Sequence, residues 1–183
     1  TAAKRSYSTT TAPAVETIGF VGLGQMGSRM APHIVHKQSS STATKLFVFD
    51  TNEKIIRDLI EQNPGHQIIG CSSPGEVASQ VQTMITMLPG PVQVKAVYKE
   101  IASHVSSEDA LFIDSSTIDP TSSQLAAQLL KSGCTFVDAP VSGGVNGAAQ
   151  GTLTFMVGGV KKDSDVYVNR VVPILSRMGK NIV

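Results

Sequence analysis

Residues 17–27 read TIGFVGLGQMG, and this stretch decides the fold. Its first five residues form a short apolar run that is typical of a buried parallel strand. The GxGxxG that follows opens a helix expected to extend to about Lys37. In such a turn the first glycine permits the tight bend, the second lets a pyrophosphate approach the backbone, and the third allows close helix–strand packing. The predicted cofactor-binding residues here are Gly22, Gly24, Gln25, Met26 and Gly27.

Asp50 completes the pattern, because it ends a second expected strand, residues 45–49, about 23 residues beyond the last glycine. A carboxylate there accepts hydrogen bonds from an adenosine ribose and repels a 2′-phosphate. Thr51 and Asn52 follow, with no arginine to receive that phosphate, so the sequence favours NAD over NADP. Asp50 can also cap the helix expected to start near Asn52, and the two roles are compatible.

Strand-like and helix-like segments alternate along the rest of the chain, which predicts a doubly wound, mostly parallel α/β sheet of the Rossmann type. Asp119 is the expected N-cap of one helix, with Pro120 at its first position and Gly133 at its end. The further expected strands cover residues 67–70, 81–88, 110–113, 134–137 and 152–157, with a last one opening at 181–183. The further expected helices cover residues 74–79, 92–104 and 162–178, the last interrupted by Pro173.

Residues 1–16 are rich in Ser, Thr and Ala and contain Lys4 and Arg5 but no acid before Glu16. This composition suits the remnant of a mitochondrial transit peptide, and equally a plain disordered tail. We therefore divide the chain into a tail, residues 1–16, and a dinucleotide-binding domain, residues 17–183. A presequence implies the mitochondrial matrix, and its absence implies the cytoplasm.

The composition excludes several classes of protein. The chain has 183 residues, 41% of them hydrophobic, and a net charge of +1. This apolar fraction can build a core, and the charge gives no electrostatic reason to expect nucleic acid or an anionic membrane as a partner. No apolar run is long enough to span a bilayer. Cys71, Cys134 and the four histidines form no metal-ligand spacing, so no metal is expected.

The later strand ends carry polar, irregular segments, which is where ligands bind in such sheets. Together with residues 19–27, the segments MLP (87–89), FIDSST (112–117), FVDAPVSGG (136–144) and GTLTFMVGG (151–159) resemble the β-hydroxyacid dehydrogenase superfamily. Within it the sequence is most similar to the 3-hydroxyisobutyrate dehydrogenase family. The motifs run in the family's order and cover almost everything after the tail.

The resemblance implies roles for individual residues. Leu88, Pro89 and Gln93 would line the nicotinamide–ribose side of the cofactor, and Thr117 would contact its nicotinamide end. Ser142, Gly143 and Gly144 would hold the carboxylate of a small hydroxyacid substrate through hydroxyl and backbone N–H donors. Asp114 and Asp138 both end strands, and we expect structural roles in which they hold loop N–H groups.

The family's catalytic lysine lies on a glycine-rich helix beyond the dinucleotide domain, and nothing in this sequence matches that segment. Lys180 precedes the expected last strand and is interpreted as a loop lysine. We therefore expect a domain truncated before the all-helical second domain, with no catalytic residue of its own, that binds NAD but turns over little. The full-length enzyme would be a homo-oligomer that oxidises 3-hydroxyisobutyrate to methylmalonate semialdehyde in valine degradation.

Two other hypotheses remain. In the first, the chain comes from a related glyoxylate, succinic semialdehyde or tartronate semialdehyde reductase, although NADP use in that group disagrees with Asp50. 6-Phosphogluconate dehydrogenase fits less well, because its glycine-rich substrate loop differs. From another class, the chain would be a non-catalytic dinucleotide-binding interaction module.

Overall fold

A six-stranded parallel sheet forms the centre of the molecule, in the order β3-β2-β1-β4-β5-β6. The computed structural model describes residues 14–38, 42–105 and 107–183. The chain winds outward from β1 in one direction and from β4 in the other, so the β1/β4 boundary is the topological switch point of the sheet. The strands are β1 (Ala14–Val21), β2 (Thr42–Phe49), β3 (Gln67–Gly70), β4 (Thr83–Thr86), β5 (Leu111–Asp114) and β6 (Thr135–Asp138).

Helices cover both faces of this sheet, and each face has its own apolar core. On one face, Ile34 and Ile174 are buried together; on the other, Tyr98 and Ala126 are buried in a second cluster. Within the described part of the chain, no helix is both long and apolar enough to cross a membrane. The helices are α1 (Gly27–His36), α2 (Glu53–Glu61), α3 (Pro74–Gln80), α4 (Pro91–His104), α5 (Pro120–Leu129), α6 (Gly144–Gln150), the π-helix η1 (Tyr167–Val171) and α7 (Val172–Met178).

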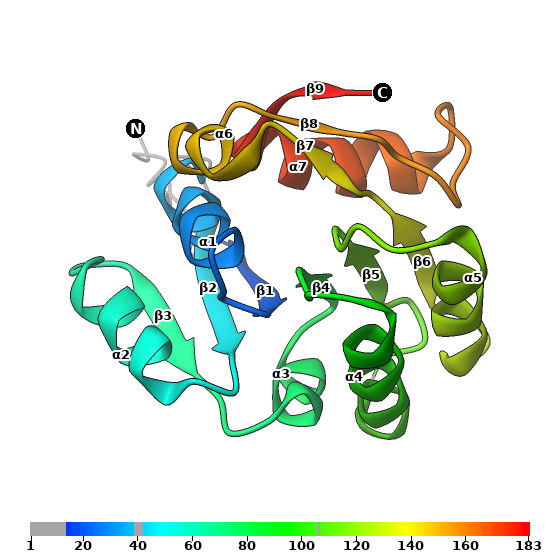
Figure 1. The fold of residues 1–183 in the computed structure, drawn as a ribbon, viewed down its shortest axis with the longest axis horizontal. Coiled ribbons are helices and arrows are strands. Elements are labelled where there is room, and N and C mark those ends of the chain that lie inside the picture. Colours follow the sequence, from blue (N-terminus) through cyan, green and yellow to red (C-terminus); the bar gives the residue numbers. More distant parts are fainter. Residues whose placement is uncertain (1–13, 39–41, 106) are drawn as a thin grey trace, which may run out of the picture.

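The doubly wound α/β fold predicted from the sequence is confirmed, with all six strands of the main sheet parallel. A second sheet lies beside it, in the order β7-β8-β9, with strands β7 (Val141–Ser142), β8 (Leu153–Phe155) and β9 (Gly179–Ile182). Figure 1 shows this small sheet, α6 and α7 together along the top of the molecule, with α3 and α4 at the bottom. The expected strand 152–157 therefore belongs to the small sheet, and Lys180 lies within a strand rather than in a loop.

The first strand begins earlier than predicted, at Ala14, so the last three residues of the expected tail, 14–16, lie in β1. Ala14 to Glu16 pair with Thr42 to Thr44 of β2 and extend the parallel ladder. Glu16 is also anchored, because its Oε2 accepts hydrogen bonds from Arg177 Nη2 at 2.8 Å and Thr44 Oγ1 at 3.1 Å. The possible transit-peptide remnant otherwise lies in residues 1–13, outside the described residues.

Two helix ends also differ from the expected ones. Asp119 does cap α5, accepting the Ser122 N–H at 3.0 Å, but the helix ends at Leu129 and Gly133 lies in the turn that follows. The last helix begins later than Lys162 and passes through the π-helix η1 before α7. Pro173 lacks an N–H group, which prevents the ordinary α-helical bond at that turn.

Candidate functional site

The glycine-rich turn connects β1 to α1 at the switch point of the sheet. Gly22 has φ +93°, and a Cβ there would lie 2.2 Å from the Met87 carbonyl oxygen. A Cβ on Gly27 would lie 1.9 Å from the Gly22 carbonyl oxygen and 3.0 Å from the Phe20 ring. Side chains at these two positions would collide with backbone, so the turn requires glycine at both.

Gly24 differs from both, because a Cβ built on it has no neighbour within 4 Å. Among the described residues, the N–H groups of Gly24, Gln25 and Met26 donate to no acceptor. The first turn of α1 contains no acidic residue, so nothing on that turn compensates the positive end of the helix dipole. This turn is therefore open, rich in free donors and electrostatically suited to an anion.

Asp50 stands beside this turn, at the carboxyl end of β2. Its Oδ2 accepts the Leu23 N–H at 2.7 Å, and its Oδ1 accepts the Asn52 N–H at 2.8 Å. The α2 helix is capped by Asn52, whose side chain accepts the Lys54 N–H, so the alternative role of Asp50 as that cap is wrong. Asp50 instead connects the end of β2 to the glycine-rich turn, with its carboxylate fixed by two backbone donors.

A cavity of about 510 Å³ joins these features across the carboxyl ends of β2, β1 and β4. One carboxylate, that of Asp50, contributes to its wall, and the remaining lining is mostly apolar or backbone. The lining residues are Val21, Gly22, Gly24, Gln25, Met26, Gly27, Phe49, Asp50, Thr51, Met87, Leu88, Pro89, Gln93, Ala96 and Val97.

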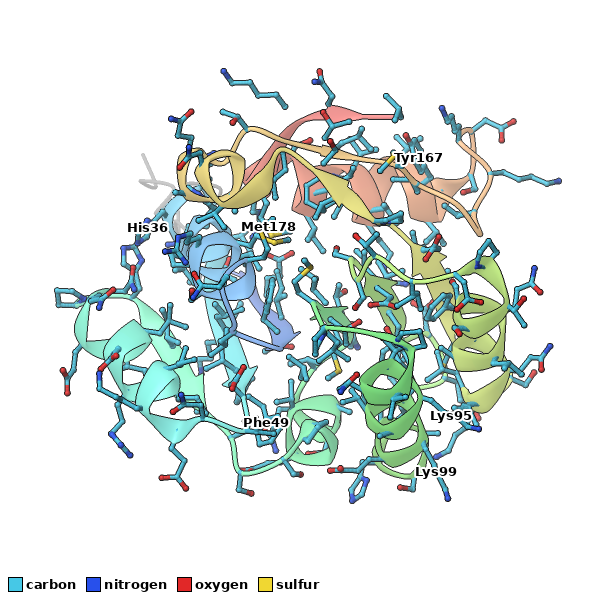
Figure 2. All side chains as sticks on the ribbon, in the orientation of Figure 1. His36, Phe49, Lys95, Lys99, Tyr167 and Met178 are labelled. Atoms are coloured by element: carbon cyan, nitrogen blue, oxygen red, sulfur yellow. The ribbon has the colours of Figure 1, made fainter. Side chains whose placement is uncertain are left out.

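Every predicted cofactor-binding residue except Thr117 lies in this wall. Thr117 is exposed and follows the end of β5, outside the lining. Sequence reasoning assigned no cofactor role to the apolar members Phe49, Met87 and Val97. Phe49 is the last residue of β2 (Figure 2), and Met87 directly follows β4, so their positions at strand ends were the available signal.

A second cavity, of about 570 Å³, adjoins the first and shares Phe49, Asp50 and Thr51 with it. Its other walls come from α2 and the end of β3, including Arg57 and Cys71. Burial, followed by the nearby charge of Glu76, raises the pKa of the Cys71 thiol to about 11. Asp50 therefore lines both cavities, and the raised pKa keeps the Cys71 thiol of the second cavity protonated at neutral pH.

The segment expected to bind a substrate carboxylate lies at the start of α6. Ser142, Gly143 and Gly144 are all exposed, and the two glycines have φ of 133° and 62°. They lie outside the lining of the 510 Å³ cavity. The helix α6 is nonetheless attached to α1, since His33 Nε2 lies 2.9 Å from the Ala148 carbonyl oxygen. Burial lowers the pKa of this histidine.

Asp114 and Asp138 lie side by side at the ends of β5 and β6. Asp114 is fully buried and accepts the Ser116 N–H at 3.1 Å, as expected for a carboxylate that holds a loop. Asp138 accepts a hydrogen bond from Ser123 Oγ at 3.0 Å. Burial raises the pKa of both carboxyl groups, although hydrogen bonds from Ser116 and Thr86 oppose the shift at Asp114.

The opposite edge of the sheet contains a larger cavity, of about 750 Å³, around the starts of β1 and β4. Its most prominent cation, Arg170, already donates to Asp109 Oδ1 at 3.1 Å and to the Asp109 carbonyl at 3.0 Å. Ligands of open α/β sheets bind at the carboxyl ends of the strands. The cavity at the glycine-rich turn is therefore the candidate site despite its smaller volume.

Comparison with known families decides what kind of domain this is. A family model described as the NAD binding domain of 6-phosphogluconate dehydrogenase matches residues 17–183. The chain belongs to this family. NAD is accordingly the cofactor of the domain, and the matched region begins at the strand that carries the glycine-rich turn.

Individual relatives give a finer comparison. The mitochondrial 3-hydroxyisobutyrate dehydrogenases of Drosophila melanogaster and Homo sapiens are 40% and 37% identical to the chain, over 91% of its length in both cases. These alignments cover 48% and 46% of the relatives, so the chain spans about half their length. One solved structure, the 3-hydroxyisobutyrate dehydrogenase of Mycobacterium tuberculosis described with L-serine, has a TM-score of 0.74 to this chain at 32% sequence identity. The matched region is 54% of that protein's chain.

Proposed function

We propose that this chain is the cofactor-binding part of an NAD-dependent 3-hydroxyisobutyrate dehydrogenase that acts in valine degradation. The observation that carries the proposal is the cavity in which the open glycine-rich turn and the Asp50 carboxylate face a common space. The relatives named above support the substrate class, and their names support a location in the mitochondrial matrix. The full-length enzyme, by its resemblance, would be a homo-oligomer.

The residues present fit a dinucleotide. The pyrophosphate would lie against the free N–H groups of Gly24, Gln25 and Met26, where the absence of a side chain on Gly24 leaves room for it. The adenosine ribose would lie at Asp50, on the β2 side of the switch point. The remaining half would extend across β4, where Leu88, Pro89 and Gln93 form the wall and Thr117 lies beyond it.

The substrate would be held by its carboxylate at Ser142, Gly143 and Gly144. A serine hydroxyl and exposed backbone N–H groups are suitable donors to an anion. The association of the Mycobacterium tuberculosis relative with L-serine, which has both a carboxylate and a primary hydroxyl, supports a small hydroxyacid as the ligand. The contact between α6 and α1 would fix this segment relative to the cofactor turn.

When bound, NAD supplies the acceptor for the hydride that leaves the primary alcohol carbon of 3-hydroxyisobutyrate, which becomes methylmalonate semialdehyde. The described lining of the cavity includes no lysine to take the hydroxyl proton. Lys95 and Lys99 of α4 are exposed and extend outward (Figure 2). The residues of this chain would thus bind and orient both reactants, while proton transfer would require the lysine-bearing helix of the family's second domain.

The preference for NAD over NADP tests this proposal through Asp50. We expect NAD to bind at least about 30-fold more tightly than NADP, because the fixed carboxylate repels a 2′-phosphate by about 2 kcal/mol. The Asp50→Asn variant keeps an acceptor for Leu23 or Asn52 but removes the charge, so the ratio should fall to about threefold or less. Isothermal titration calorimetry with both dinucleotides measures the two ratios.

Asp58→Asn provides the control for this experiment, because Asp58 is a carboxylate of α2 that is 41% exposed and pairs with Lys54 on the helix surface. Its NAD-to-NADP ratio should equal that of the unmodified chain. Tighter binding of NADP than of NAD by the unmodified chain would contradict the proposal and favour one of the related semialdehyde or glyoxylate reductases.

A further inference from the structure

A buried hydrogen-bonded network connects the centre of the sheet to the wall of the cavity. Asp114 Oδ1 accepts three hydrogen bonds, from Thr86 Oγ1 at 2.8 Å, Ser116 Oγ at 2.5 Å and Ser116 N at 3.1 Å. The side chains of Thr86, Asp114 and Ser116 are all 0% exposed. Thr86 and Asp114 are also partners in the β4–β5 register, so the two strand ends are joined by side chains as well as by backbone.

The direction of each hydrogen bond in this network follows from the donors available. Asp114 Oδ1 is the acceptor in all three bonds, so Thr86 and Ser116 both point their hydroxyl protons at it. The Ser116 oxygen is then free to accept, and it receives the Leu88 N–H at 2.9 Å. On the other side, Tyr98 must donate its hydroxyl proton to Thr86 Oγ1, across 3.0 Å. The network thus ends on a backbone group of a cavity-lining residue.

The order of strands in the sheet places Leu88 on one side of the candidate site. Asp50 lies at the end of β2, the glycine-rich turn at the end of β1, and Leu88 just beyond β4, in that spatial order. A dinucleotide with its adenosine ribose at Asp50 and its pyrophosphate at the turn must place its other half over β4. Leu88 therefore forms the wall on the nicotinamide side.

We propose that Ser116 and Asp114 are positioning residues that fix the Leu88 backbone, and with it the wall that holds the nicotinamide half of NAD. The proposal rests on the proposed NAD site and goes further, because it assigns a binding role to buried residues that do not line the cavity. Without the Ser116 hydroxyl, the Leu88 N–H loses its partner, and the Met87–Pro89 segment loses this hydrogen bond to the loop after β5.

The test compares the binding of NAD with that of ADP, which lacks the nicotinamide half. In Ser116→Ala we expect the dissociation constant for NAD to rise about tenfold and that for ADP to change less than about twofold. In Thr86→Val, which removes one donor to Asp114 but keeps the Leu88–Ser116 bond, the rise for NAD should be smaller, about threefold, again without an effect on ADP. Both constants come from calorimetric titration, with thermal unfolding measured on each variant.

Ser123→Ala is a matched control, since its hydroxyl also donates to a strand-end carboxylate, Asp138, but is not connected to Leu88. It should leave both dissociation constants unchanged within about twofold. Equal weakening of NAD and ADP in Ser116→Ala, or no weakening of NAD, would overturn the inference while leaving the proposed function intact. Failure of the unmodified chain to bind either nucleotide would overturn both.

Discussion

Gly27→Ala is expected to lower the free energy of unfolding by about 3 kcal/mol, the largest effect on stability that we predict. Alanine favours helices over glycine by about 1 kcal/mol, so an exposed position in α1 would gain from this change. Here the new Cβ would lie 1.9 Å from the Gly22 carbonyl oxygen. Backbone cannot rotate away as a side chain can, so the turn or the helix must shift. Denaturant unfolding followed by circular dichroism measures the loss.

Gly158→Ala provides the control for this variant. A Cβ on Gly158 has its nearest neighbours, in Asp138, at 3.9 Å or more, which is ordinary contact. Its free energy of unfolding should stay within about 0.5 kcal/mol of the unmodified chain. Equal stabilities for the Gly27→Ala and Gly158→Ala variants would show that the close approach of α1 to the turn is not a constraint on the fold.

Gly24→Val is expected to weaken NAD binding at least about 30-fold while leaving stability almost unchanged. The position is open, with no neighbour within 4 Å of a Cβ, and its φ is not positive, so the folded chain tolerates a side chain there. Under the proposed function, the same open space is where the pyrophosphate would approach the backbone N–H groups. Gly24→Ala should show a smaller loss, because it fills less of that space.

Calorimetric titration with NAD and denaturant unfolding are both applied to the two Gly24 variants. A loss of stability as large as that of Gly27→Ala would mean that Gly24 is constrained by the fold rather than by the ligand. Unchanged NAD affinity in Gly24→Val would mean that the pyrophosphate does not lie against this turn.

The glycine spacing and Asp50 predicted the wall of the candidate site from sequence alone because their positions follow from topology. Parallel strands end at one edge, so residues after β1, β2 and β4 must converge there. Pro89 and Gln93 were predicted by resemblance and lie in the same wall. Thr117 also follows a strand end, yet it lies outside the lining, because convergence at an edge does not fix the direction of an exposed loop residue.

Other features depend on contacts that no local pattern records. Glu16 was assigned to a tail on composition, but Arg177, 161 residues away in the chain, anchors it in β1. The strand at Leu153–Phe155 has an ordinary apolar pattern, and only its pairing with β7 and β9 shows that it belongs to a separate sheet. The network from Tyr98 to Leu88 likewise joins α4, β4 and the loop after β5, so it becomes visible only when these elements are in place.

The central claim is that NAD binds at the glycine-rich turn, and proton–nitrogen correlation spectra of the labelled chain test it most directly. On titration with NAD, we predict that the amide signals of Leu23, Gln25, Thr51 and Leu88 shift and saturate together. Shifts confined to the opposite edge of the sheet, around Gln82 and Arg170, or the absence of any shift at millimolar NAD, would contradict the account.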